Sequence, residues 1–113
     1  MNGKAKQLFR EEVGDIEPEL VIRTKAKIDA GRWWRRTPLW LCVVGRDLVM
    51  LAVARRRYFA RVPLSDSKDS FYHHATGEFV VVSDQDLEIP KFLMRPRDAL
   101  AVLEYLKPSQ KSL

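Results

Sequence analysis

The chain has 113 residues, 46% of them hydrophobic, and its 20 Lys and Arg against 15 Asp and Glu give a formal net charge of +5 at pH 7. This length and apolar content predict one domain with one hydrophobic core. The single cysteine, Cys42, excludes an internal disulfide, and the sequence shows neither a signal-like apolar run after the basic residues near Met1 nor a stretch approaching the ~20 apolar residues of a membrane span. We therefore expect a cytoplasmic protein without a transmembrane segment, whose contact with a membrane would be peripheral.

The first predicted element is a short helix from Lys4 to Val13, whose apolar residues lie near one face. Gly14 ends this helix and Pro18 prevents a simple continuation. A helix this short is not stable alone, so it must dock either on its own sheet or on a neighbouring molecule. A strand is expected from Glu19 to Ile28, because small or apolar residues alternate there with basic ones. The strand is thus predicted to be half-buried, with a basic outer face.

From residue 37 to residue 83 short apolar runs alternate with turn residues, a pattern typical of an antiparallel meander. The expected strands are Leu39–Val44, Leu48–Val53, Tyr58–Leu64, Phe71–Ala75, Phe79–Ser83 and Leu87–Ile89. Pro38 is placed where a strand can begin, and Gly45 predicts a tight hairpin. The period then changes to that of a helix that begins at Pro96 and ends before Pro108, with apolar residues at Ala99, Val102, Leu103 and Leu106. The predicted fold is mainly β with α.

Seven antiparallel strands followed by one amphipathic helix resemble the pleckstrin-homology-like (PH-like) fold, in particular small bacterial PH-like domains. The resemblance covers Glu19 to Leu106 and is carried by the hairpin from Leu39 to Leu51 and by the segment Arg61 to Asp66. It implies a seven-stranded bent sheet or barrel capped by the C-terminal helix. The implied domain occupies residues 19–107, with a helical extension at 1–18 and a frayed tail at 108–113.

Basic residues are concentrated between Arg23 and Arg61, where eleven Lys or Arg face only Asp29 and Asp47. Such a surface attracts anionic lipid head groups or an acidic protein, and less plausibly nucleic acid, which usually needs several spaced aromatic residues. In PH-like members that bind phosphoinositides the loop between the first two strands is basic. The equivalent stretch here is basic as well, although its arginine spacing departs from the (Lys/Arg)-x-Arg of those members.

The predicted ligand-binding residues share a basic or interfacial side chain. They are Lys25, Lys27, Arg32, Trp33, Trp34, Arg35, Arg36, Arg55, Arg56 and Arg57. Guanidinium groups bind phosphates and indole rings settle at the head-group level of a membrane. Ordinary packing of the two tryptophans and a solvated arginine turn are the alternatives.

The sequence contains no catalytic or nucleotide-binding signature, and we expect a protein that is not an enzyme and needs no cofactor. Cys42 lies between apolar neighbours and is predicted to be a core residue. His73 and His74 are consecutive in a predicted strand, so one is expected on the surface and the other in the core rather than both on a metal. The expected function is a non-catalytic binding module that contacts anionic ligands or a membrane surface. The alternative is a protein-interaction adaptor or homo-oligomerising domain that uses a strand edge or an apolar patch.

Overall fold

The computed structural model describes residues 1–29, 34–53 and 57–107. In these residues seven strands form one antiparallel sheet in the order β4-β3-β2-β1-β7-β6-β5, so the sheet is open and its edges are β4 and β5. The strands are β1 Leu20–Asp29, β2 Trp34–Val44, β3 Asp47–Val53, β4 Arg57–Pro63, β5 Phe71–His73, β6 Glu78–Val80 and β7 Lys91–Leu93. The helices are α1 Gly3–Glu12 and α2 Pro96–Leu106, with a 3₁₀ turn, η1, at Leu64–Ser67. The predicted fold class, a seven-stranded antiparallel sheet with one helix at each end of the chain, is confirmed.

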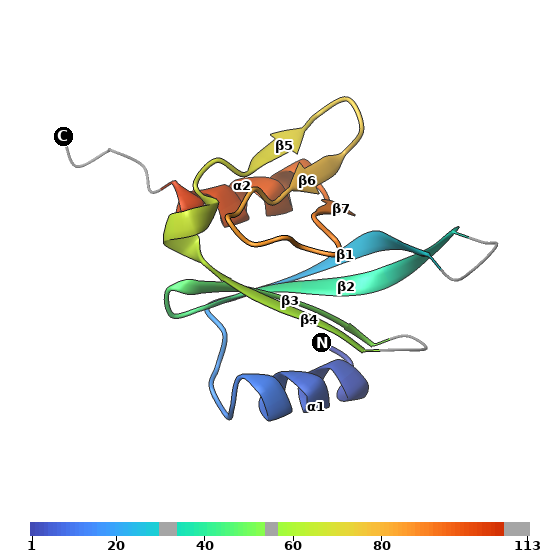
Figure 1. Ribbon diagram of the computed structural model, residues 1–113, viewed down its shortest axis with the longest axis vertical. Coiled ribbons are helices and arrows are strands. Elements are labelled where there is room, and N and C mark those ends of the chain that lie inside the picture. The colour runs from blue at the N-terminus through green and yellow to red at the C-terminus, as the bar shows by residue number, and fades with distance from the viewer. Residues whose placement is uncertain (30–33, 54–56, 108–113) are drawn as a thin grey trace.

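The two helices lie on opposite faces of the sheet, as Figure 1 shows. We call the face that α1 covers the outer face, and the face toward α2 and β5–β7 the inner face. The side chain of Asn2 caps α1 by accepting a hydrogen bond from the Ala5 amide at 2.8 Å. Ala5, Leu8 and Phe9 are buried in a cluster with Cys42 and other side chains of β2 and β3. The helix therefore docks on its own sheet.

The inner face holds the larger core. On α2 the buried residues are Ala99, Val102 and Leu106, at the spacing that the sequence predicts. Phe79 of β6 and Phe92 of β7 stack with their rings 6.5 Å apart. Side chains of β2 and β3 enter the inner and outer clusters alternately. Because both faces of these strands are buried, their sequences are continuous apolar runs rather than alternating ones.

The strand β2 begins at Trp34, earlier than the predicted start at Leu39. Its register with β3 begins at Trp40↔Leu51, so Pro38 pairs only with Lys25 of β1. A proline past the last pair of β2 with β3 removes no hydrogen bond of that pairing, which explains why β2 continues through it. The predicted hairpin at Gly45 is confirmed, because Gly45 has a φ of 58° and Val44 pairs with Asp47 across a two-residue turn.

The prediction of a strand at Leu87–Ile89 is wrong, because the seventh strand is Lys91–Leu93. The Val81 amide donates to the Pro90 carbonyl at 2.8 Å, which closes the base of a loop over the residues between them. The alternation of Leu87 and Ile89 instead reflects two apolar side chains that this loop packs against the inner core. The predicted strands Phe71–Ala75 and Phe79–Ser83 are likewise shortened to three residues each.

Candidate functional site

The longest pairing in the sheet, between β1 and β2, continues beyond the register of β3. Five pairs, from Lys25↔Pro38 to Asp29↔Trp34, lie past the last pair of β2 with β3, and β7 pairs with β1 only at Lys25↔Leu93. We call residues 25–29 and 34–38 the β1–β2 arm. Figure 1 shows this two-stranded ribbon reaching past the ends of β3 and β4. The arm is thus accessible to a binding partner at that end of the molecule.

The arm contains half of the ten predicted ligand-binding residues. These are Lys25, Lys27, Trp34, Arg35 and Arg36, and the backbone places Lys27 directly opposite Arg36. The only acidic residue of the arm is Asp29. Arg32, Trp33, Arg55 and Arg56 lie outside the described residues. The structure therefore gathers the described basic positions of the predicted loop into one ribbon.

Two basic side chains are exposed where β1 enters the arm. Arg23 and Lys25 lie on the outer face, and neither forms an ion pair with any carboxylate in the described ranges. The Arg23 guanidinium lies 5.9 Å from the centre of the Trp40 ring, its cross-strand partner. This cation–π contact holds Arg23 in place without neutralising it. The sequence analysis did not select Arg23, because its contact with Trp40 depends on the register between β1 and β2, which the sequence does not show.

The predicted ligand residue Arg57 has a partner within the chain. Its Nη1 lies 2.7 Å from Oε2 of Glu11 in α1, and both side chains are about half exposed. The strand ends Val53↔Arg57 and Asp29↔Trp34 lie at the same end of the sheet, opposite the turn between β2 and β3. The arm and the start of β4 at Arg57 therefore lie at one end of the sheet. Arg57 nevertheless forms an ion pair with α1, so it is less available to bind a phosphate group.

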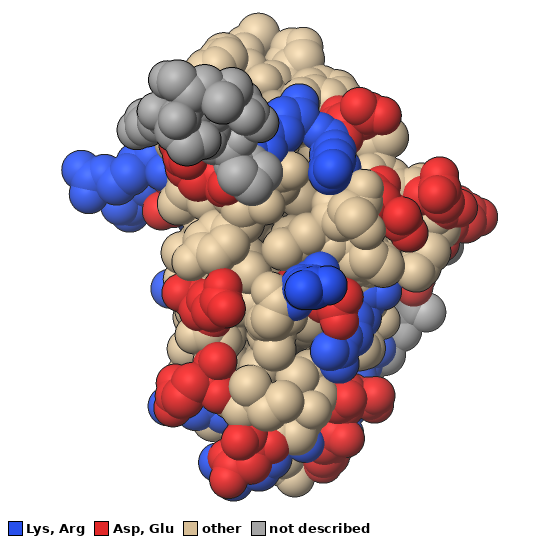
Figure 2. All heavy atoms as spheres, turned by 90° about the vertical axis from the view of Figure 1, so that its left-hand side faces the viewer, with Lys and Arg blue, Asp and Glu red and all other residues tan. Residues whose placement is uncertain are grey.

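The opposite end of the molecule differs in charge. Figure 2 views the end that carries the β2–β3 turn, where basic and acidic side chains are interspersed. On that face no large area of one sign is seen among the described residues. A mixed surface of this kind favours solubility rather than attraction of a polyanion. The arm end is therefore the better candidate for a charged partner.

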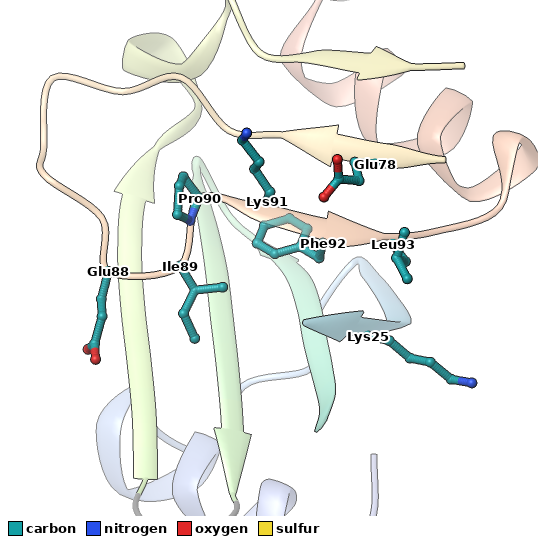
Figure 3. Close-up of a pocket in the computed structure, with 8 residues that line it drawn as sticks. All are labelled: Lys25, Glu78, Glu88, Ile89, Pro90, Lys91, Phe92 and Leu93. Atoms are coloured by element: carbon teal, nitrogen blue, oxygen red, sulfur yellow. The ribbon is translucent and has the colours of Figure 1, made fainter. Parts of the chain in front are cut away.

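A hollow of about 310 Å³ beside Lys25 does not form a binding site. Its charged lining residues include Glu78, Glu88 and Lys91. In Figure 3 Lys25 and Glu88 point away from each other and from the centre of the hollow, while Phe92 and Leu93 form its wall. Charged groups that bind a small ligand must converge on it. We therefore assign Lys25 to the outer surface of the arm.

Groups suited to chemistry are not assembled in the described residues. Cys42 is fully buried, and burial raises the pKa of its thiol to about 11, so it is predominantly protonated at neutral pH. Burial also raises the pKa of the Tyr58 phenol, with the Ile89 backbone opposing and the Glu88 carboxylate adding to the shift. The described ranges hold no group of three or more potential metal ligands.

The expectation of one buried histidine is wrong, because His73 and His74 are both exposed. The strand β5 ends at His73, whose carbonyl accepts hydrogen bonds from the Thr76 and Gly77 amides, so alternation does not extend to His74. The His74 ring packs edge-on against the Tyr72 ring, and their centroids lie 4.9 Å apart.

Neither helix in the described part of the chain is long and apolar enough to cross a bilayer. No protein-family model, curated protein or solved structure matches the chain. The geometry of the arm and of the sheet edges therefore carries the functional reasoning.

Proposed function

We propose that this chain is a non-catalytic, cytoplasmic PH-like binding module that contacts an anionic membrane surface through the β1–β2 arm. The strand count, the antiparallel pairing and the C-terminal helix support the PH-like assignment. The observation that carries the functional proposal is the arm itself, a projecting ribbon with four basic positions against one acidic position. Arg23, beside the arm, adds a fifth cation, and Arg23 and Lys25 are both exposed with no carboxylate partner among the described residues.

The energetics of such a contact favour a reversible peripheral attachment. Each Lys or Arg close to an anionic bilayer contributes about 1 kcal/mol, and the attraction is screened within about 8 Å at physiological salt. Trp34 lies at the described end of the arm, where an indole ring suits the head-group layer. Four arm cations together contribute about 4 kcal/mol, which corresponds to a change in affinity of about 1000-fold.

Vesicle co-sedimentation across a salt series tests this proposal. The arm variant carries Lys25→Gln, Lys27→Gln, Arg35→Gln and Arg36→Gln. Its matched control loses the same charge from exposed residues outside the arm, through Arg46→Gln, Lys68→Gln, Arg95→Gln and Arg97→Gln. We expect the wild type and the control variant to bind phosphatidylserine-containing vesicles at low salt, and the arm variant to bind about 100- to 1000-fold more weakly. Circular dichroism checks that both variants are folded.

Three outcomes would contradict the proposal. Absence of wild-type binding at low salt would exclude an anionic membrane as the partner. An equal loss in the two variants shows that net charge rather than the arm determines binding. Tighter binding to a single-stranded or duplex oligonucleotide than to vesicles, at the same salt, replaces the membrane with nucleic acid.

A further inference from the structure

The side of α2 that faces away from the inner core carries a large apolar residue. Leu100 is 65% exposed, the highest value for a large hydrophobic residue in the described part of the chain. Beside it lies a groove of about 220 Å³ between α2 and β5, whose lining includes Leu103 and Phe71, and Phe71 is itself 44% exposed. Neighbouring exposed apolar side chains at a groove are typical of a surface that another protein covers.

The charged residues on the same side of α2 have both signs. Arg97 and Glu104 are exposed and lie seven residues apart, so they share a face of the helix, with Leu100 between them. The helix rises about 10.5 Å over seven residues, too far for these two side chains to pair within one helix. Among the described residues neither forms an ion pair with another side chain.

The groove itself favours neither an acidic nor a basic occupant. Its charged lining residues are Glu104 and Lys107, one of each sign. The occupant that fits best therefore presents an apolar residue flanked by the same two charges in the opposite order. A second copy of α2 that runs antiparallel to the first presents this pattern.

An antiparallel pair of α2 helices about a two-fold axis beside Leu100 brings the complementary groups together. Arg97 of each copy then lies level with Glu104 of the other, and the two Leu100 side chains meet at the axis, next to the grooves. The cations Arg95 and Lys107 lie beyond these ion pairs, at the two ends of the contact, where solvent screens their repulsion. A contact that uses the same patch on both copies closes as a dimer.

We propose that two copies of this chain associate through α2, antiparallel about a two-fold axis beside Leu100, with Arg97 of each copy paired with Glu104 of the other. One pair of helices buries less than the roughly 1,200–2,000 Å² of a standard stable interface. The dimer therefore forms at high concentration, and the chain is a monomer in dilute solution. The contact does not involve the β1–β2 arm and is independent of membrane binding.

Sedimentation equilibrium of the full chain, from about 10 μM to about 1 mM, measures this association. We expect the wild type to form a dimer as the concentration rises. Leu100→Ser should weaken the dimer at least about tenfold, because it removes the apolar contact at the axis. The matched control is Ile16→Ser, at a residue that is 53% exposed between α1 and β1, and it should leave the association unchanged. Circular dichroism checks that both variants are folded.

An exchange of charges tests the antiparallel orientation. Arg97→Glu places acidic residues opposite each other and Glu104→Arg places basic ones, so each variant alone should dimerise at least about tenfold more weakly. An equimolar mixture of the two variants should regain dimer formation, because their heterodimer contains both ion pairs again.

Two features of these variants exclude simpler explanations. Both keep a net positive charge, so attraction between oppositely charged molecules does not produce the heterodimer. Each substitution also suits the helix dipole, with an acidic residue in the first turn of α2 or a basic one in the last, so the helix is not weakened.

Any of four results overturns the proposal. These are a wild type that is monomeric at about 1 mM, dimer formation that Leu100→Ser leaves unchanged, an equal loss in Leu100→Ser and Ile16→Ser, or a mixture of the charge variants that associates no better than either variant alone. None of these measurements uses vesicles, so a failure here leaves the membrane proposal standing, and a failure of vesicle binding leaves the dimer standing.

Discussion

Leu8→Ala should expose Cys42 to thiol reagents far more than Leu106→Ala does, because the two leucines pack on opposite faces of one sheet. Both residues lie in helices, and both are almost completely buried, at 2% and 1% exposure. Leu8 shares the outer cluster with Cys42, whereas Leu106 belongs to the inner core. The pair is therefore matched in chemistry and burial and differs in the layer that is weakened.

The structure sets the size of the effect. With the pKa of Cys42 raised from 9.0 to about 11, the thiolate fraction at pH 8 falls about 100-fold, to about 0.1%. A buried Leu→Ala substitution costs about 2–5 kcal/mol. If α1 must undock before the reagent enters, the lower figure alone raises the open population, and with it the labelling rate, about 30-fold.

The assay follows the reaction of the single cysteine with 5,5′-dithiobis(2-nitrobenzoate), and urea melts measure the overall stability of both variants. We expect slow labelling of the wild type and of Leu106→Ala, and labelling at least about 30-fold faster for Leu8→Ala. Equal acceleration in the two variants would show that Cys42 becomes accessible only on global unfolding. Wild-type labelling as fast as that of an unfolded control would show that α1 does not protect it.

Three further predictions concern stability. Burial raises the pKa of Cys42 in the folded state to about 11, so the folded state favours the neutral thiol. The resulting stabilisation is complete below the ordinary pKa of the thiol and is lost as the pH rises toward 11, by up to about 3 kcal/mol. Cys42→Ala should lack this loss in urea melts at pH 8–11, and the same dependence of unfolding free energy on pH in the variant and the wild type would contradict the assignment. Gly45→Ala should cost about 1–2 kcal/mol because its φ is 58°, whereas Gly3→Ala, which meets no atom within 4 Å in α1, should not destabilise; equal melting temperatures would refute the turn argument. Thr24→Val removes the buried hydroxyl that donates to the Leu39 carbonyl at 2.8 Å and should lower the free energy of unfolding by about 1 kcal/mol. An unchanged free energy of unfolding, measured by calorimetry, would contradict this prediction.

Local periodicity was sufficient to predict most of the fold. The alternation of β1 and the helical spacing of α2 each persist over about ten residues, and both elements lie where the sequence places them. The segment Leu87–Ile89 is too short for its alternation to separate a strand from a loop that buries two side chains. The same limit explains His74, since alternation predicts a face only while the strand continues.

The candidate sites depend on relations that no local pattern contains. The register that places Arg23 over Trp40, and the projection of the arm beyond β3, follow from how three strands are aligned. The partner of Arg57 lies 46 residues away in α1. The sequence shows which residues are basic. It does not show which of them form ion pairs within the chain, or which strand lies at the open edge of the sheet.

The position of α1 also orders events during synthesis. This helix leaves the ribosome before β2 and β3, which build its binding surface, and its ion pair with Arg57 needs a residue made 46 positions later. A ten-residue helix has little stability alone, so the nascent segment waits as a largely unstructured chain until the hairpin of β2 and β3 has formed. Contacts that close such long loops slow folding. The apolar outer face is thus uncovered during translation for as long as α1 remains undocked, and this interval is when the chain is most exposed to aggregation and to chaperones.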